Sequence, residues 1–327
     1  MSLRDVLDGG RKPLVLDGGF GTMVQGYGLG EEDFRGYRYR DIQGMLSGNN
    51  EMLNLTRPDV VSSIYDAYVL AGVDLLTANT FSANAVSQSD YNCQHLVAEM
   101  NREAVRLARE CFARNGRKGF VIGTVGPTNK SLSISPDIND PACRSITFDC
   151  LTAAYREQMQ VLVEAGVDAI MMETVFDTLN AKAGIFAARE VKDATGHDIP
   201  LMMSVTVNDS QGRLLSGQTL EAFLISVSHA PLLSIGLNCS FGADEMLPIL
   251  RSLRKMVETR VSYGAPRWYV SCHPNAGLPN AMGQYDVNPE SFVRSVRPMI
   301  EEKLVDIIGG CCGTTPEHIR ALRDVCR

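Results

Sequence analysis

Several features that mark other protein classes are missing from this sequence. No apolar run approaches the roughly 20 residues of a membrane-spanning helix, and the N-terminal segment MSLRDVLDGGRK lacks the apolar stretch of a signal peptide. There is no basic run and no stripe of aromatic and arginine residues, and the formal net charge of −7 disfavours a surface for nucleic-acid phosphates. We therefore expect a cytoplasmic protein that binds neither membranes nor nucleic acids.

The nine cysteines also lack the dense, regular spacing of a secreted disulfide scaffold. With 45% hydrophobic residues over 327 positions, the chain has enough apolar material to form a core without a metal ion or disulfides. In a reducing compartment, clustered thiols indicate metal binding or catalysis.

A repeating pattern runs through the whole chain: a short apolar run, a turn, and then a longer segment with helical spacing. The eight apolar runs occupy residues 13–19, 73–80, 120–127, 167–174, 200–207, 232–240, 267–277 and 305–313. Short runs that are buried on both faces are typical of parallel strands. The tetrapeptide AGVD at the start of the second and fourth runs indicates one strand-helix unit that is used repeatedly.

The segments between the runs predict helices, and several of them end at a glycine in the usual C-cap position. The predicted helices span residues 57–72, 93–116, 147–166, 177–196, 219–230 and 314–326. No linker or low-complexity tract interrupts the pattern. We therefore predict an α/β protein with one domain over residues 1–327, a (β/α)8 TIM barrel. A doubly wound open sheet is the alternative, because strand order cannot be read from the pattern.

Reactive residue types gather where the apolar runs end. These residues are Asp17, Asn79, Glu173, Asn238, Cys239, Cys272, His273, Asn275, Cys311 and Cys312. In a barrel such positions surround one mouth, whereas in an open sheet they would not all converge. Two long connections, residues 20–56 and 127–146, are expected to cover the same mouth and to be functional.

Four cysteines at the ends of the last three runs form the strongest chemical signal: Cys239, Cys272, Cys311 and Cys312. The other five cysteines lie in helical patterns or loops without partners, so we interpret them as small hydrophobic residues. Adjacent cysteines on a continuing strand would point to opposite faces. The glycines that flank Cys311 and Cys312, at positions 309, 310 and 313, permit a sharp turn that aims both thiols inward.

Two such thiolates and a third cysteine would make a zinc site with an open fourth position, which is the arrangement of catalytic zinc. A zinc ion with three thiolates activates water poorly, but it can bind a substrate thiol and keep its sulfur nucleophilic. Coincidental packing and thiol redox chemistry are the alternatives. The third ligand is Cys239 or Cys272, and the residues alone do not choose between them. We interpret His273 as an ordinary loop histidine.

The segment LDGGFGT has glycines after a strand, as in nucleotide-binding loops. Val24 stands where the third glycine of that motif belongs, and the following segment is predicted to be a loop, so a dinucleotide site is disfavoured. The same backbone amides could hold a small anion such as an amino-acid carboxylate. Glu173 follows the apolar residues IMM, where an unpaired charge is costly, so it needs a substrate ammonium or a structural Arg or Lys.

Seven segments, in order along the chain, carry a resemblance to a known family: LVLDGGFGTM, LLTANTF, GPTNKSLSISPDINDPA, METVFDTLNAKA, GLNCSFGADE, PNAGLPNA and GGCCGTTPEHI. They resemble the homocysteine-binding zinc domain of cobalamin-dependent methionine synthases, within the homocysteine S-methyltransferase family. The resemblance implies a TIM barrel with Zn²⁺ bound by Cys239, Cys311 and Cys312. For the substrate it implies a carboxylate site at Gly19, Phe20, Gly21 and Thr22, an ammonium site at Asp17 and Glu173, and a pocket that includes Asn79 and Asn275.

The activity implied by the resemblance is that of the homocysteine domain of a 5-methyltetrahydrofolate–homocysteine methyltransferase. L-Homocysteine binds zinc as a thiolate and attacks methylcobalamin, which gives methionine and cob(I)alamin. The cobalamin motif Asp-x-His-x-x-Gly is absent from the sequence, so the cofactor is expected on a cobalamin-binding module, and a folate-binding module is expected too, in cis or in trans.

Two other functions compete with this one. The first is a free-standing methyltransferase that uses S-methylmethionine or betaine as the donor. The second is a non-catalytic zinc protein in which Cys272 or His273 supplies a fourth ligand.

Overall fold

The computed structural model describes residues 1–10 and 12–327, and its centre is one parallel β-sheet. The eight strands are β1 (Leu14–Val15), β2 (Leu75–Ala78), β3 (Phe120–Val125), β4 (Ala169–Val175), β5 (Leu201–Val205), β6 (Leu232–Asn238), β7 (Tyr269–His273) and β8 (Ile307–Ile308). Each strand falls within one of the eight predicted apolar runs, except that β4 extends one residue beyond its run, to Val175. The strand predictions are therefore confirmed.

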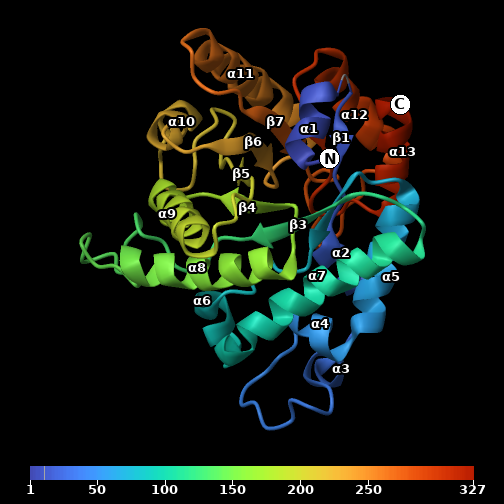
Figure 1. The fold of residues 1–327 in the computed structure, drawn as a ribbon, viewed down its shortest axis with the longest axis vertical. Coiled ribbons are helices and arrows are strands. Elements are labelled where there is room, and N and C mark those ends of the chain that lie inside the picture. Colours follow the sequence, from blue (N-terminus) through green and yellow to red (C-terminus); the bar gives the residue numbers. More distant parts are fainter. Residues whose placement is uncertain (11) are drawn as a thin grey trace.

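The strand order shows that the sheet curls into a barrel. Every strand from β2 to β8 is paired with its sequence neighbours, and β1 pairs with β8 through Leu14–Ile307 and Val15–Ile308. A parallel bridge between Leu16 and Leu75 joins β1 to β2. This closure confirms the TIM barrel and excludes the doubly wound sheet, and Figure 1 shows the strands surrounded by helices.

The helices of the described residues lie outside the strands. They are α1 (Leu3–Gly9), α2 (Phe20–Gln25), α3 (Glu31–Arg35), α4 (Leu53–Thr56), α5 (Pro58–Ala71), α6 (Ala85–Gln88), α7 (Val97–Arg114), α8 (Phe148–Ala165), α9 (Thr178–Thr195), α10 (Leu220–Val227), α11 (Ala243–Ser262), α12 (Pro289–Glu301) and α13 (Pro316–Cys326), with short 3₁₀ turns η1 (Asn50–Met52), η2 (Ser89–Tyr91) and η3 (Gln94–Leu96). All six predicted helices are present. Gly72, Gly166 and Gly196 end α5, α8 and α9 in the left-handed conformation, as the C-cap signals predicted.

Two local predictions are wrong. His273 was interpreted as an ordinary loop histidine, but it is the buried last residue of β7, because the strand continues one residue beyond Cys272. The segment after the LDGG sequence was predicted to be a loop, but Phe20–Gln25 forms the short helix α2. The segment is rich in glycine and gives no helical pattern, and tertiary contacts hold its start. The amide of Gly19 donates to the carbonyl and hydroxyl of Thr314, both at 3.1 Å, and Thr22 Oγ1 donates back to the Gly19 carbonyl at 3.1 Å.

Apolar side chains fill the N-terminal end of the barrel. Leu16, Leu75, Ile122 and Met202 meet inside it, and Leu3 and Leu7 of α1 pack onto this cluster. A second and larger core lies between the sheet and the surrounding helices. The base is therefore closed by packing, and the open space of the barrel lies at the carboxyl ends of its strands.

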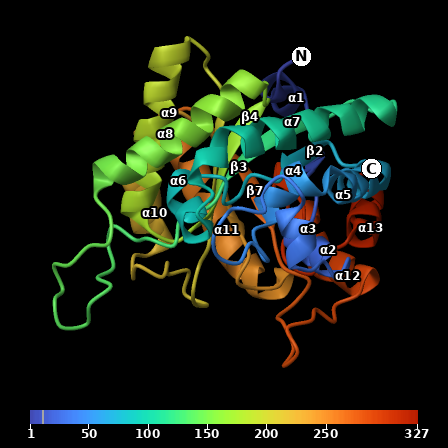
Figure 2. The same cartoon turned by 90° about the horizontal axis from the view of Figure 1, so that it is seen from below.

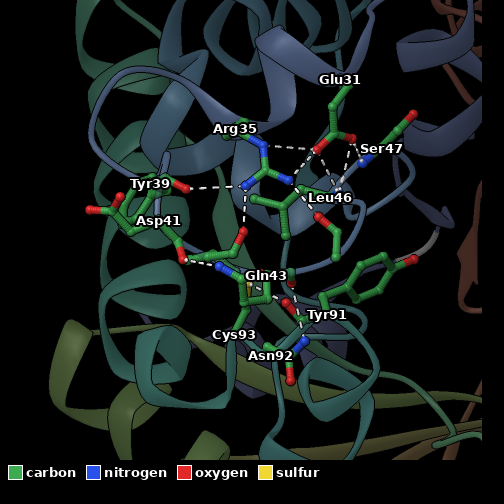
Figure 3. A network of polar contacts seen from close by, with 12 residues as sticks. Glu31, Arg35, Tyr39, Asp41, Gln43, Leu46, Ser47, Tyr91, Asn92 and Cys93 are labelled. Atoms are coloured by element: carbon green, nitrogen blue, oxygen red, sulfur yellow. Dashed lines mark hydrogen bonds and ion pairs between the residues drawn. The ribbon is translucent and has the colours of Figure 1, made fainter.

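The long connection of residues 20–56 is organised around one ion pair (Figure 3). Glu31 binds the Arg35 guanidinium at 2.6 Å and also accepts the amides of Leu46 and Ser47, which together lower its pKa. The guanidinium donates to carbonyls further along the same connection, including that of Ile42 at 2.6 Å. The segment is thus held by its own polar contacts, which help to place η1 and α4 at the mouth.

Two other long connections extend on one side of the barrel, away from α1 (Figure 2). They are the segment between β3 and α8, which contains residues 127–146, and the segment between β7 and α12. Asp177 anchors the base of the first one by accepting from the hydroxyl of Ser133 at 2.7 Å and its amide at 2.9 Å. No helix in the described part of the chain is long and apolar enough to cross a membrane.

Candidate metal centre and substrate cavity

Cys239 follows directly after β6 in an unusual backbone conformation. Its φ is +60°, and the next residue, Ser240, has the same value. Non-glycine residues rarely adopt this left-handed conformation, and it persists where surrounding contacts enforce it, often at functional sites. Here the Cys239 amide donates to the His273 carbonyl at 3.3 Å, and the Cys239 carbonyl accepts from the Phe241 amide at 2.7 Å. The turn lifts the Cys239 side chain toward the cavity.

Cys311 and Cys312 lie in the tight turn after β8. The Cys311 amide donates to the Pro274 carbonyl at 2.9 Å, and the Cys312 amide donates to Asn275 Oδ1 at 3.1 Å. The following Gly313 has a φ of +78°. A Cβ atom at Gly310 would lie 2.3 Å from Thr314 Oγ1. Gly313 is therefore needed for its dihedral, as the sequence indicated, whereas Gly310 is needed for a close contact that the sequence did not indicate.

The three thiols form a compact triangle. Cys312 Sγ lies 4.0 Å from the sulfurs of both Cys239 and Cys311, and all three sulfurs are within 4.8 Å of one another. Contacts with Cys311 and Cys312 lower the pKa of Cys239, whereas contacts with Cys239 and Cys312, together with burial, raise that of Cys311. Within the described ranges, 1–10 and 12–327, this is the one group of three or more His, Cys, Asp or Glu side chains that could hold a metal ion.

Cys272 faces away from this triangle. Its buried sulfur lies 3.8 Å from Met246 Sδ of α11, on the outer side of the sheet, and burial raises its thiol pKa to about 12. Side chains alternate along a strand, so Cys272 and the triangle lie on opposite faces of β7. The geometry therefore favours Cys239 over Cys272 as the third ligand.

A bulge in β4 directs Glu173 toward the cavity. The pairing with β5 shifts register between Met172 and Val175, and Thr174 has a φ of +58°. Asn238 holds this bulge by accepting from the Thr174 amide at 3.0 Å and donating to the Thr174 hydroxyl at 2.9 Å. Asn238, which precedes Cys239, and Thr174, which follows Glu173, are thus joined by two hydrogen bonds.

The environment of Glu173 and Asp17 is short of cations. Neither carboxylate forms an ion pair with any lysine or arginine of the described residues, which leaves the structural Arg or Lys considered for Glu173 without support. Burial is the main cause of a raised pKa for both carboxyls, about 8 for Glu173 and about 7 for Asp17. Asp17 Oδ2 accepts from the amide and hydroxyl of Thr77, both at 2.8 Å.

A cavity of about 320 Å³ connects the carboxylates with the thiols. Its walls are mostly polar, glycine or cysteine residues, and the lining includes Asp17, Gly19, Phe20, Gly21, Thr22, Asn79, Glu173, Cys239, His273, Gly310, Cys311 and Cys312. Of the residues that sequence reasoning assigned to the metal or the substrate, only Asn275 is absent from the lining. It is buried behind the cysteines and holds the Cys312 amide.

Asn79 lines the cavity, and its side chain already forms hydrogen bonds within the protein. Its amide group donates to the Asn50 carbonyl at 2.8 Å and to Asn54 Oδ1 at 2.9 Å. These bonds fix the η1 turn to the end of β2. The geometry therefore gives Asn79 a part in shaping the wall, whatever further contact it makes with a ligand.

Two buried residues of the site were missed at the sequence level. Thr314 bonds the Gly19 amide and donates to the Cys311 carbonyl at 2.6 Å, so it joins the β1 and β8 turns. Glu51 lines the cavity and accepts from the Ser82 amide at 2.8 Å. The GCCGTTP segment contained a signal for Thr314, but nothing marked Glu51, because it follows no apolar run.

Comparison with known proteins shows the family of this chain. The family model for homocysteine S-methyltransferases matches residues 14–326. The chain belongs to the homocysteine S-methyltransferase family. The match covers all eight strands of this methyltransferase and every residue of the cavity.

Solved structures of one family protein share the fold of this methyltransferase. The homocysteine methyltransferase MmuM from Escherichia coli, in its oxidised form, is 20% identical with a TM-score of 0.73, and the match covers 98% of each chain. The metallated form of MmuM is 21% identical with a TM-score of 0.72, covering 98% of this chain and 99% of that one. At this identity the likeness establishes the fold alone.

Proposed function

We propose that this methyltransferase methylates L-homocysteine to methionine with a zinc ion at Cys239, Cys311 and Cys312, and that its methyl donor is methylcobalamin carried by another module or protein. The observation that carries the proposal is the thiol triangle at one end of a cavity that also holds carboxylates, Asp17 and Glu173 among them, without ion pairs to the described lysines and arginines. The sulfur and ammonium of one small amino acid match these two features.

The donor set fits zinc. Tetrahedral zinc with Zn–S distances of about 2.3 Å brings its ligand sulfurs about 3.8 Å apart, and two of the observed separations are 4.0 Å. Three protein ligands leave one position for a substrate. When bound, zinc would act as a Lewis acid that lowers the pKa of the substrate thiol and holds its sulfur as a thiolate.

The protein groups around the cavity would orient the amino acid. Asp17 and Glu173 bind the ammonium, since a cation offsets the cost of a buried carboxylate. The first amides of α2, at Phe20 and Gly21, bind the carboxylate, because a helix leaves its first-turn amides without helical acceptors. The substrate sulfur would then be fixed at the thiol triangle, ready to displace the methyl group from its donor.

The donor is tested by supplying the zinc-loaded chain with homocysteine and one methyl source at a time. We expect methionine from methylcobalamin, which can be followed by the change in cobalamin absorbance. Turnover with S-methylmethionine or betaine but not with methylcobalamin would overturn this part of the proposal.

A free-standing enzyme with a small sulfonium or betaine donor is the second candidate. It is supported by the match to MmuM, a homocysteine methyltransferase whose chain is covered almost completely by the single barrel. The same donor assay separates the two candidates.

A non-catalytic zinc protein would need a fourth protein ligand, and neither Cys272 nor His273 belongs to the thiol group in the described residues. Cobalt substitution tests this alternative. If homocysteine leaves the thiolate-to-cobalt absorption band unchanged, its sulfur does not reach the metal and the catalytic proposal fails.

A further inference from the structure

His273 has a central place in the cavity that the proposed roles do not use. It is the last residue of β7, the strand between β6, which leads to Cys239, and β8, which leads to Cys311 and Cys312. Its register partner on β6 is Asn238, the residue before Cys239. The histidine is therefore flanked by the two strands that supply the thiols.

The side chain points into the barrel. The preceding Cys272 contacts Met246 of α11 outside the sheet, and successive strand residues alternate between faces. The ring accordingly lines the cavity together with Glu173 and Cys239. It is only 3% exposed, so it is fixed within the wall.

The ring lacks a partner in the protein. His273 Nε2 is buried without a hydrogen bond to any described residue, although the backbone carbonyl of the same residue holds the Cys239 amide. Buried polar atoms are nearly always paired, so an orphan at a cavity wall points to a ligand that completes it. The neighbouring groups of the cavity, Asp17, Glu173 and the thiols, are chiefly acceptors, which suits a ring that donates an N–H.

We infer that His273 is a positioning residue for homocysteine, with a ring N–H that donates a hydrogen bond to the substrate's sulfur. The inference rests on the proposed function, because it requires homocysteine in this cavity. The sulfur is the part of the substrate that must approach Cys239 and Cys312, and His273 is joined to Cys239 by a backbone hydrogen bond. The carboxylate and ammonium have other partners, at α2 and at the two acidic side chains. No covalent step is assigned to the ring.

The test compares two ligands and two substitutions. His273→Phe keeps the ring volume and removes the donor, whereas His273→Gln keeps an amide donor. Binding of L-homocysteine and of L-2-aminobutanoate, which has the same ammonium and carboxylate but no sulfur, is measured by titration calorimetry on zinc-loaded protein. Zinc content and thermal unfolding are recorded for each variant.

We expect His273→Phe to weaken homocysteine binding about tenfold, since a hydrogen bond to a charged acceptor is lost, and to leave 2-aminobutanoate binding within about twofold. His273→Gln should remain within about threefold of the wild type for both ligands. Zinc content should be equal in all three proteins.

Three results would overturn the inference. Equal weakening of both ligands would assign the ring to the amino-acid end, unchanged homocysteine binding would show that it makes no contact, and loss of zinc would show that it supports the thiols instead. If the wild type itself fails to bind homocysteine, the proposed function fails together with the inference. Should His273→Phe not unfold cooperatively, His273→Met takes its place, because methionine fills irregular gaps without a donor.

Discussion

Carboxylates occur at both ends of this barrel, but those at the base form ion pairs with arginines and those at the mouth do not. At the base, Asp74, Asp168 and Asp306 accept the amides of Val15, Val121 and Val270 and pair with arginines. At the mouth, Asp17 and Glu173 have no arginine or lysine partner among the described residues. The base carboxylates are satisfied by the protein, so they serve folding. The mouth carboxylates lack such a partner, which costs stability that the apolar base must offset, and in the proposed function the ammonium of the substrate supplies the missing charge.

The base pattern also explains the repeated AGVD segment. Its aspartate, at positions 74 and 168, accepts the amide of the second residue of the preceding odd-numbered strand and is paired with Arg323 or Arg109. Asp306 repeats this arrangement before β8 with Arg254 at 2.9 Å. The sequence repeat is thus a structural device of the barrel's base and has no part in the metal site.

The largest contrast between the two ends should come from removing a thiol. Cys311→Ala is expected to reduce bound zinc from about one ion per chain to nearly none after dialysis against a chelator, and to abolish methyl transfer. Cooperative unfolding should persist, because the base and outer core do not need the metal. The measurements are metal analysis and urea unfolding. Cys150→Ala, at an exposed position of α8, is the control and should keep both zinc and activity.

Loss of cooperative unfolding in Cys311→Ala would mean that the mouth is structural after all. The contrast between the two ends would then disappear, because both would serve folding.

The cost of an unsatisfied mouth carboxylate should be visible in the pH dependence of stability. Asp17 has a folded pKa of about 7, above its unfolded value of 3.8, because burial favours the neutral form. Its contribution to the free energy of unfolding is therefore fully present below pH 4. This contribution is lost as the pH rises to 7, by about 4 kcal/mol at most. Asp17→Asn should remove this loss from metal-free protein, as measured by urea unfolding between pH 4 and 8. Parallel curves for the two proteins would contradict the assignment.

Neutralising the other mouth carboxylate should separate binding from stability. Glu173→Gln is expected to weaken homocysteine binding about 100-fold, equivalent to about 2.7 kcal/mol, through loss of the ammonium partner. Its unfolding free energy should stay level or rise, since a costly buried charge is gone. Glu164→Gln, on the exposed side of α8, removes the same charge as a control and should change neither quantity. A destabilised Glu173→Gln protein would show that the carboxylate has a structural partner.

The smallest effect is expected at the base, where a substitution should lower stability and leave homocysteine affinity unchanged. Asp306→Asn keeps an acceptor for the Val270 amide but loses ion pairs to Arg254 at 2.9 Å and Arg267 at 3.2 Å. We expect about 1 to 2 kcal/mol less stability, since the pair is partly exposed, and unchanged homocysteine affinity. Calorimetry and urea unfolding measure the two quantities. Weaker binding in this variant would indicate that the base is coupled to the site.

Sequence reasoning located the strands well because each consists of a short apolar run between turn signals. It also identified the reactive residue types at the strand ends, including Glu173 and the cysteine pair. It failed for α2, whose start is fixed by Thr314 from the far end of the chain. It could not place Asn275 behind the cysteines, because that position depends on the packing of the β7 and β8 turns.

The sequence by itself determined the eightfold repeat, the glycines of the cysteine turn and the types of group available at the strand ends. These are local properties, set by hydrophobic periodicity and by what each backbone position can adopt. Only the tertiary structure decided which groups meet. Barrel closure brings β1 beside β8, the left-handed turn at Cys239 and the inward turn at Cys311 and Cys312 gather three sulfurs, and strand alternation turns Cys272 outward and His273 inward. These outcomes depend on contacts between residues far apart in the chain, which no local pattern encodes.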